Sequence, residues 1–187
     1  DALDLGILDT LADGLWHAGP ELAEAAGISR AALGKRVTQI SEGHWGLDIE
    51  SRHGRGYRIA GGLDLLSQAA GRPKPSLASV PGLLLRTHCH STNDELLAAP
   101  EAEVAITEFQ SGGRGRRGRR WVAPFAQNLL MSIRYRYTSW PSDLPALSLC
   151  LGLAIVRLLR QRKIPAQIKW PNDIWLKGRK LGGILVD

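Results

Sequence analysis

The apolar and polar positions of the first 42 residues follow the pattern of three short amphipathic helices. The first has Gly14 near its end, and its apolar stripe at three- and four-residue spacing consists of Leu3, Ile7, Leu8, Leu11 and Leu15. The second, over 20–26, opens with proline and is broken by Gly27. The third runs from Arg30 to about Glu42 with Ser29 as its N-cap, and its inward side chains are Ala32, Leu33, Val37 and Ile40. This order predicts a helix-turn-helix.

A basic hairpin is predicted to follow these helices. Short strands over 47–50 and 57–59 flank the glycine-containing tip 52–56, which is typical of a wing. Acidic residues concentrate on the first two helices, and a DNA backbone responds to local charge before net charge. We therefore predict a winged helix-turn-helix DNA-binding domain over 1–62 that contacts DNA through Ser29, Arg30, Lys35, Arg36, Arg52 and Arg55. A purely structural or dimerising module is the alternative.

The rest of the chain is predicted to be a linker and a mixed α/β domain, so that the fold class is α+β. The linker, 63–80, begins with a possible helix over 63–70 and is stiffened by two prolines. In the domain over 81–187 the predicted strands are 83–85, 104–109, 128–137, 173–176 and 180–186. Helices are predicted over 93–98 and 144–163, the second capped at Ser142 with an inward side of Leu147, Leu151, Ile155 and Leu158.

Composition and charge narrow the functional class. The chain has no apolar run near the ~20 residues that cross a membrane, and its two cysteines have no disulfide-framework spacing. A soluble, cytoplasmic protein is therefore expected. Residues 1–62 carry six Lys/Arg against nine Asp/Glu, a net charge of −3, whereas residues 63–187 carry eighteen against nine, a net charge of +9. The excess of cations in the second part favours a polyphosphate ligand.

Two segments of the second part are candidate ligand loops. Segment 88–93 follows a strand, and its hydroxyl and amide groups suit a polar head group, although an ordinary N-cap has the same residues. A metal site at His88-Cys89-His90 lacks further ligands. Segment 110–121 places five arginines among glycines, which lets backbone approach a ligand and supplies donors for phosphate or carboxylate. Its arginines and the following proline exclude a dinucleotide fingerprint, and a nucleic-acid arm is the alternative.

Two further segments supply a lysine each. Segment 169–173, Lys-Trp-Pro-Asn-Asp, turns sharply and brings an amide, a carboxylate and a lysine together. Segment 179–185 has Lys180 beside two glycines on a strand predicted to be buried. Charge beside an apolar run is costly unless an anion or a partner receives it, so Lys180 is predicted to point at a ligand.

Together and in this order, the four segments resemble the catalytic core of biotin–protein ligases. The front of the chain resembles the bifunctional class that also represses the biotin operon, so the resemblance runs from the helix-turn-helix through residue 187. Lipoate–protein ligases share the fold but lack the glycine-arginine loop. Because the family's catalytic core continues past the position of Asp187, the chain is expected to end partway through that domain.

The resemblance implies a role for each matching residue. Biotin binding is implied for Ser91, Thr92, Asn93, Gln110, Gly113, Arg114 and Lys180. ATP binding is implied for Arg116, Arg117, Arg119, Arg120, Trp121, Asn172 and Asp173. The implied catalytic residues are Lys180, between the biotin carboxylate and the α-phosphate, and Arg116. Mg²⁺ is expected to be held through the phosphates, with Asp173 as a possible protein contact.

The implied activity is a two-step transfer of biotin to a protein lysine. Biotin and ATP form biotinyl-5′-AMP, and a lysine of a biotin carboxyl carrier protein then accepts the biotin. The other implied partners are operator DNA and a second copy of the chain, in a homodimer that forms when the adenylate is bound. Two alternatives remain: a ligand-sensing transcription regulator whose ligase-like domain lacks transfer activity, and a lipoate or octanoyl transferase.

Overall fold

The computed structural model describes residues 2–43, 45–66, 80–139 and 144–187. It forms two compact units, one of residues 1–113 with 122–134 and the other of residues 114–121 with 135–187. Most of the predicted linker and the predicted cap Ser142 lie outside the described residues.

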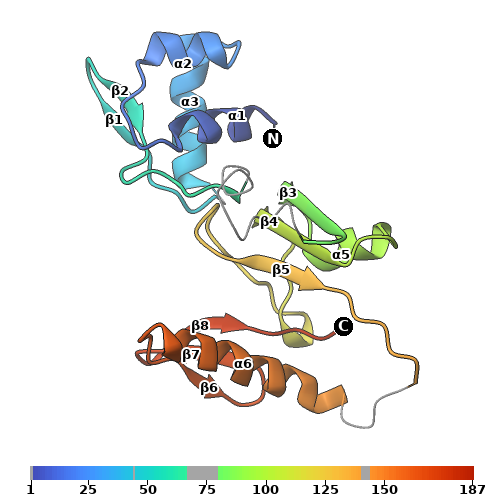
Figure 1. Ribbon diagram of the computed structural model, residues 1–187. Helices are drawn as coiled ribbons and strands as arrows, with labels where there is room; N and C mark the ends of the chain where they lie inside the picture. The colour runs from blue at the N-terminus through green and yellow to red at the C-terminus, as the bar shows by residue number, and fades with distance from the viewer. Residues whose placement is uncertain (1, 44, 67–79, 140–143) are drawn as a thin grey trace. The chain divides into compact units, whose positions relative to one another are not determined.

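The first unit begins with three helices, as the apolar pattern predicts (Figure 1). They are α1 (Ala2–Leu11), α2 (Gly19–Ala25) and α3 (Arg30–Glu42). The Ser29 hydroxyl accepts a hydrogen bond from the backbone N–H of Ala32 at 3.2 Å, which confirms the predicted N-cap. Two predicted inward residues are wrong: Leu15 lies beyond the end of α1 and is 65% exposed, and Ala32 is exposed in the first turn of α3.

A two-stranded antiparallel hairpin follows, formed by β1 (Glu50–Arg52) and β2 (Gly56–Arg58). The segment before α2 pairs with this hairpin, since His17 and Tyr57 exchange backbone hydrogen bonds of 2.9 and 3.0 Å. Gly56 has φ +95°, and a Cβ at this position would lie 1.9 Å from the His17 carbonyl oxygen. This close approach requires glycine.

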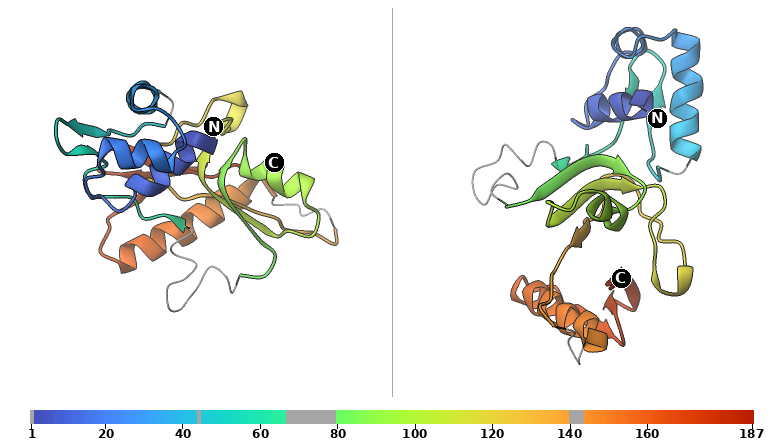
Figure 2. Two further views of the ribbon diagram at one scale, coloured as in Figure 1. Left: turned by 90° about the horizontal axis from the view of Figure 1, so that it is seen from above. Right: turned by 90° about the vertical axis from the view of Figure 1, so that its right-hand side faces the viewer.

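The same unit continues into a three-stranded sheet of order β3-β4-β5. Strand β3 (Leu83–Cys89) pairs in parallel with β4 (Val104–Gln110), which pairs antiparallel with β5 (Leu130–Ile133). Helix α5 (Thr92–Ala98) connects β3 to β4 and packs on the sheet (Figures 1 and 2). Strand β3 is longer than predicted, and β5 is shorter than the predicted 128–137.

One core joins the helices to this sheet. The Trp45 ring lies 4.8 Å from the Phe109 ring and 5.5 Å from the Phe125 ring, measured between centroids. The backbone N–H of Phe125 also donates to the Trp45 carbonyl oxygen at 2.8 Å. All three side chains are buried in one apolar cluster with those of the helices, including Leu8 and Ile40. Strand β4 is thereby packed against residues that precede the basic hairpin.

The second unit consists of loop 114–121, a helix and a three-stranded antiparallel sheet of order β6-β7-β8. After the 3₁₀ turns Arg116–Gly118 and Leu144–Ala146, its elements are α6 (Leu147–Gln161), β6 (Gln167–Lys169), β7 (Asp173–Leu176) and β8 (Arg179–Gly183). Helix α6 packs on the sheet through Val156, which contacts Ala166 and Ile174 in a small core (Figure 1).

The predicted inward side of α6 is wrong for the described unit. Leu151, Ile155 and Leu158 are 44, 39 and 50% exposed, while Gly152 and Val156 are buried. The side chains of Ile168 on β6 and of Ile184 lie against the helix at Gly152. A Cβ at this position would lie 3.4 and 3.6 Å from their Cδ1 methyl groups. The contact face therefore centres on the smallest residue of the helix and not on its leucines. Strand β8 is also more exposed than predicted.

Within the described ranges, no helix has the length and apolar character needed to cross a membrane.

Candidate functional site

The turn from β3 into α5 gathers the polar residues that the sequence singles out. The Ser91 hydroxyl caps α5 by accepting the backbone N–H of Asn93 at 3.3 Å. Ser91 and Thr92 are both buried. An uncharged hydroxyl that is buried must be hydrogen-bonded, so these two side chains are held in fixed positions.

Gln110, at the end of β4, completes this polar cluster. Its Oε1 atom accepts hydrogen bonds from the backbone N–H of Thr92 at 2.7 Å and from the Thr92 hydroxyl at 3.1 Å. Four predicted biotin residues, Ser91, Thr92, Asn93 and Gln110, are thus brought together in one unit.

Ser132 belongs to the same cluster, although the sequence analysis missed it. Its hydroxyl lies 2.7 Å from the Thr92 hydroxyl and also contacts the Asn93 side-chain amide. The sequence feature that could have identified Ser132 is a hydroxyl residue between the apolar Met131 and Ile133, on a strand whose side chains alternate between two faces. The even-numbered residues of β5 face α5, which places Ser132 beside the helix N-terminus.

The glycine-arginine loop begins against the same turn. The backbone N–H of Gly112 donates to the His90 carbonyl oxygen at 2.8 Å. The His90 ring lies over Gly112 and occupies the space that a Cβ would take there. Gly113 is buried. The predicted biotin residue Gly113 is therefore in the first unit, while Arg114 begins the part of the loop that belongs to the second unit.

In the second unit, residues 114–121 form a small hairpin. Arg114 and Arg120 make an isolated antiparallel bridge, and the Gly115 N–H donates to the Arg119 carbonyl oxygen at 2.7 Å. Arg117 at the tip has φ 60° and Gly118 has φ +69°, which closes the turn. Of the cations predicted to bind phosphate, Arg117, Arg119 and Arg120 are exposed and have no ion-pair partner among the residues that the structure describes. An ordered hairpin with unpaired guanidinium groups is suited to receive an anion.

The loop contacts the Trp-Pro-Asn-Asp turn through Arg116. Its Nη1 atom donates to Oδ1 of Asn172 at 3.3 Å. Asn172 is held in turn by its Nδ2 atom, which donates to the Ile184 carbonyl oxygen at 3.0 Å. Two residues predicted to bind ATP, 56 positions apart, are therefore neighbours.

Lys180 is the centre of a second contact group. Its Nζ atom lies 2.7 Å from Oδ1 of Asp173 and 5.1 Å from the centroid of the Trp121 ring. A Cβ at Gly183 would lie 3.3 Å from Lys180 Nζ, so this glycine leaves room for the ammonium group. A lysine, a carboxylate and an aromatic ring from three segments thus meet at one point of the second unit. The remaining predicted residue, Arg114, lies 4.0 Å from Asp187 between Nη2 and Oδ2.

Two kinds of alternative chemistry find no support in this arrangement. The described residues contain no group of three or more His, Cys, Asp or Glu side chains that could hold a metal ion, and Asp173 is paired with Lys180. The described residues therefore do not fit a protein-held Mg²⁺ centre. Burial raises the pKa of the Cys89 thiol, which makes this cysteine a poor nucleophile.

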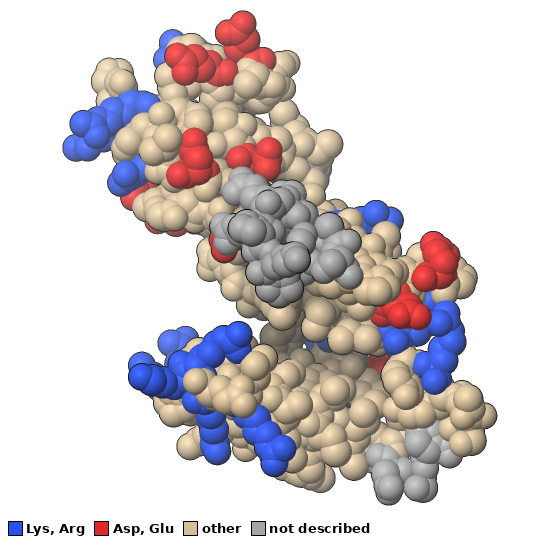
Figure 3. Space-filling model, viewed as in Figure 1, with Lys and Arg blue, Asp and Glu red and all other residues tan. Residues whose placement is uncertain are grey.

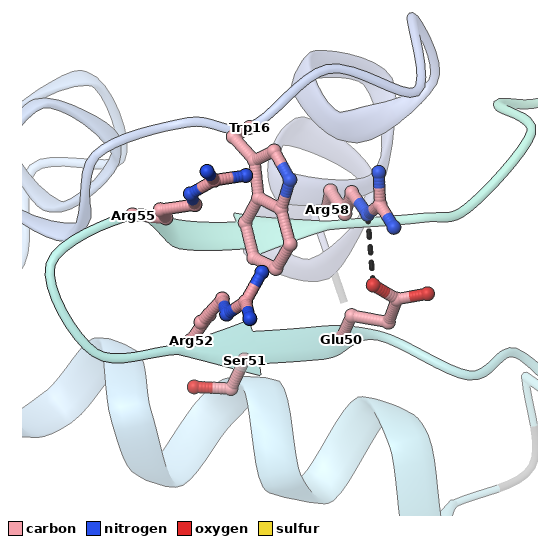
Figure 4. Close-up of a pocket in the computed structure, with 6 residues that line it drawn as sticks. All are labelled: Trp16, Glu50, Ser51, Arg52, Arg55 and Arg58. Atoms are coloured by element: carbon pink, nitrogen blue, oxygen red, sulfur yellow. Dashed lines mark hydrogen bonds and ion pairs between the residues drawn. The ribbon is translucent and has the colours of Figure 1, made fainter.

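The basic hairpin is a candidate nucleic-acid interface. Figure 4 shows the Trp16 ring flanked by the side chains of Arg52, Arg55 and Arg58, in a shallow pocket. The Arg58 guanidinium lies 4.7 Å from the Trp16 ring centroid, and its Nε atom is 2.8 Å from Oε2 of Glu50. Arg52 and Arg55 are exposed and have no ion-pair partner in the described part of the chain. The sequence analysis missed Trp16. This residue precedes α3 in the chain, whereas its neighbours in the pocket follow α3.

Helix α3 presents part of its predicted contact set. Ser29, Arg30 and Lys35 are exposed. Arg36 has a structural role that the sequence analysis missed, because its Nε atom lies 2.6 Å from Oδ1 of Asp4 on α1. On the face seen in Figure 3, acidic residues lie over α1 and α2, whereas basic residues gather over the hairpin and over the second unit.

Comparisons with known proteins place the chain in a family. Residues 86–187 match the model of the Biotin/lipoate A/B protein ligase family. The chain is 37% identical over 188 residues to the bifunctional ligase/repressor BirA of Salmonella typhimurium, covering 98% of this chain and 57% of that protein. It is 35% identical over 195 residues to BirA of Escherichia coli, covering 100% of this chain and 58% of that protein. The chain thus spans somewhat more than half the length of these relatives.

Among solved structures, the chain is similar to the biotin protein ligase from Aquifex aeolicus in complex with biotin and ATP. The TM-score is 0.50 and the identity 29%, over 55% of this chain and 45% of that chain.

Proposed function

Because the chain belongs to the biotin/lipoate A/B protein ligase family, we propose that it is a biotin–protein ligase that is also a biotin-responsive repressor. The ligase forms biotinyl-5′-AMP from biotin and ATP and transfers biotin to a lysine of a biotin carboxyl carrier protein. The observation that carries the proposal is the contact group of the second unit. There Arg116, in the hairpin of residues 114–121, donates a hydrogen bond to Asn172, and Lys180 contacts Asp173 and the Trp121 ring.

The two substrates are recognised by different residues. The biotin head group binds in the polar cluster at the start of α5, which is called the neutral cluster because its side chains carry no charge. This cluster includes Thr92, Asn93 and Gln110, with Ser91 as the cap of the helix. ATP binds at the cationic hairpin, where Arg117, Arg119 and Arg120 receive phosphate oxygens. Trp121 and Asn172 border the adenine.

In the first step, a carboxylate oxygen of biotin attacks the α-phosphorus of ATP. The bond between the α-phosphorus and the bridging oxygen breaks, and pyrophosphate leaves. Two anions must approach each other, so the protein has to hold them together and neutralise the charge that develops. Lys180 supplies that charge at the carboxylate and α-phosphate, and Arg116 supplies it from the hairpin. The ion pair with Asp173 keeps the Lys180 ammonium group in place before the substrates bind.

In the second step, the amine of the carrier lysine attacks the carbonyl carbon of the adenylate. The bond to the AMP oxygen breaks, AMP leaves, and the nitrogen gives up a proton. The mixed anhydride hydrolyses readily. The hairpin of residues 114–121 therefore closes over it and excludes water until the carrier arrives.

The first 62 residues bind operator DNA. Arg30 and Lys35 of α3 contact the duplex, and Arg52 and Arg55 of the basic hairpin β1–β2 contact phosphates. Binding of the adenylate promotes a homodimer, and two copies of the DNA-binding domain then occupy the two halves of an operator.

Incorporation of labelled biotin into a biotin carboxyl carrier protein tests the ligase proposal. The chain is incubated with biotin and ATP, and both biotinyl-5′-AMP and labelled carrier are quantified, with lipoate and octanoate as competing acids. Biotinyl-5′-AMP and labelled carrier together support the proposal. Adenylate without labelled carrier supports the ligand-sensing regulator instead, and preferential use of lipoate or octanoate overturns the choice of substrate.

A further inference from the structure

The backbone N–H of Thr92 sets the direction of the hydrogen bonds in the neutral cluster, and Ser132 holds the Thr92 hydroxyl in that direction. We propose that a one-way chain of donors runs from the Asn93 side-chain amide to Ser132, from Ser132 to Thr92, and from Thr92 to Gln110. The inference rests on the proposed function, because its effect is measured as a change in the affinity for biotin. It makes Ser132 a positioning residue that holds the Thr92 hydroxyl, which donates to Gln110.

The chain is anchored at Gln110. A backbone N–H can only donate, and that of Thr92 points at Gln110 Oε1 at 2.7 Å, so the carbonyl side of this amide faces Thr92. The Thr92 hydroxyl, 3.1 Å from the same oxygen, must then be the donor. A hydroxyl has one proton, and Thr92 has now used it.

The next link follows from the same count. The Thr92 and Ser132 oxygens are 2.7 Å apart, and Thr92 can only accept. Ser132 therefore donates its proton to Thr92. The remaining contact of Ser132, with the Asn93 side chain, needs a donor from Asn93.

This requirement fixes the orientation of the Asn93 amide. The nitrogen and oxygen of an amide are assigned from the hydrogen-bond network, because their positions are nearly interchangeable. The structure has Oδ1 toward Ser132. In that orientation the Ser132 proton goes to Asn93, and the two hydroxyl oxygens lie 2.7 Å apart with no proton between them. With the amide reversed and Nδ2 toward Ser132, each link from Asn93 through Ser132 and Thr92 to Gln110 has one donor and one acceptor.

The result is a cluster with a defined polarity at its ligand end. With Oε1 used by Thr92, Gln110 presents Nε2 as a donor, and this group has no hydrogen-bond partner among the residues that the structure describes. A head group that offers an acceptor, such as the carbonyl oxygen of a cyclic urea, satisfies it. A dithiolane ring or an alkyl chain does not, so the polarity selects against those acids.

Strand β5 and the residue after it are tied to both sides of α5. Directly after β5, Arg134 donates to the carbonyl oxygens of Pro100 at 2.7 Å, of Ala102 at 2.8 Å and of Ala99 at 3.0 Å, all in the segment that follows α5. The strand that places Ser132 beside the helix N-terminus is therefore anchored at its end to the segment beyond the helix C-terminus. A strand held in this way keeps the Ser132 hydroxyl within reach of Thr92.

Calorimetric titration of the full chain with biotin tests the polarity. Ser132→Ala removes the relay, and Asn93→Asp replaces the donor Nδ2 with an oxygen of the same shape. Both are expected to weaken biotin binding about tenfold, whereas Ser132→Thr, which keeps the hydroxyl, stays within about threefold of the parent. Ile133→Ala, on the exposed face of the same strand, is the matched control, and ATP affinity stays at the parent value in all four variants.

Asn93→Asp separates the two polarities. A carboxylate accepts a proton from Ser132 as well as an amide oxygen does, so parental biotin affinity in this variant overturns the one-way chain. Parental affinity in Ser132→Ala, or equal losses of biotin and ATP affinity, also overturns it. If the parent chain itself does not bind biotin, the proposed function fails, and that result is visible before any variant is compared.

Discussion

The two units hold their candidate ligand residues by opposite means. In the first unit, hydroxyl and amide groups of Thr92, Gln110 and Ser132 are at least half-buried and hydrogen-bonded to one another. In the second, guanidinium and ammonium groups stand at the surface, where contacts such as those of Arg116 with Asn172 and of Lys180 with Asp173 order them.

This contrast shows what each kind of site must provide. A neutral head group is recognised by direction, so its site must be organised before the ligand arrives. A polyphosphate is recognised by charge, which acts over a longer range and tolerates a site that closes only on binding. The first unit is therefore expected to determine which acid is accepted, and the second to determine how fast it is activated.

Loss of the Lys180 ammonium group is expected to have the largest effect. In Lys180→Met the charge at the reacting phosphate is removed while the length of the side chain is kept. Removing one such donor reduces adenylate formation about 10²- to 10³-fold. Lys177→Met, in the turn of the same strand pair, is the control, and kcat/KM for ATP is measured for both. A rate for Lys180→Met within threefold of the control would assign the chemistry to other residues.

Arg116→Ala is expected to have the next largest effect. It breaks the contact between the hairpin and Asn172, so the closed loop loses one of its supports. The adenylate should dissociate about tenfold faster, which is followed by chasing bound, labelled biotinyl-5′-AMP with unlabelled ligand. Arg162→Ala, at the end of α6, removes an equal charge elsewhere in the second unit. Equal dissociation rates in Arg116→Ala and the parent refute the gating role.

Salt should distinguish the two units without any mutation. Between ~0.05 M and ~0.5 M NaCl the Debye length shortens severalfold, which screens exposed cations far more than buried hydrogen bonds. ATP affinity is expected to fall severalfold, while the affinity for biotinamide, which lacks the carboxylate, changes less than twofold. Calorimetric titrations at both salt concentrations measure this. An equal salt dependence of the two ligands would mean that the neutral cluster does not hold the head group.

The sequence predicts the elements of the first unit better than their contacts. Helix α3 and its Ser29 cap follow from periodicity and a local hydrogen bond, which a single segment contains. Ser132 contacts Asn93 across 39 positions and a strand pairing, which no local pattern records. Trp45 likewise packs on Phe109 and Phe125, so an aromatic residue beside the hairpin becomes part of the core beneath β4.

In the second unit the motifs are predictable and the packing is not. The pairing of Arg116 with Asn172 agrees with the family resemblance, because both positions lie in motifs that imply ATP binding. The buried face of α6 was misassigned because periodicity weights the large apolar residues, whereas the buried residues of α6 are Gly152 and Val156. A pattern of hydrophobicity cannot show that the smallest residue marks the contact.

The smallest predicted effect concerns Glu108, a buried carboxylate of the first unit. It lies on β4 two residues before Gln110, and it accepts a hydrogen bond from the backbone N–H of Leu66. Burial raises the pKa of Glu108, the hydrogen bond from Leu66 lowers it, and the nearby Asp64 raises it further, with a net increase above 4.5. Asp173 in the second unit instead has a lysine beside it.

A raised pKa in the folded state means that the folded protein binds this proton more tightly than the unfolded chain does. The stability that it contributes is fully present below pH 4.5, the ordinary value, and is lost as the pH rises through the higher folded value. Glu108→Gln is neutral at every pH and still offers an oxygen to Leu66. Its Tm should exceed that of the parent by a few degrees, on the order of 3 °C, at pH 8, and the difference should shrink toward pH 4.5.

Thermal unfolding followed by circular dichroism across this pH range measures the effect. Glu101→Gln, an exposed carboxylate of the same unit, is the control for the change in net charge. If the Tm difference between Glu108→Gln and the parent is the same at both ends of the range, the carboxylate is ionised without penalty. The first unit then tolerates a buried charge next to its neutral cluster, and the contrast between the two units would lie in exposure alone and not in the exclusion of charge.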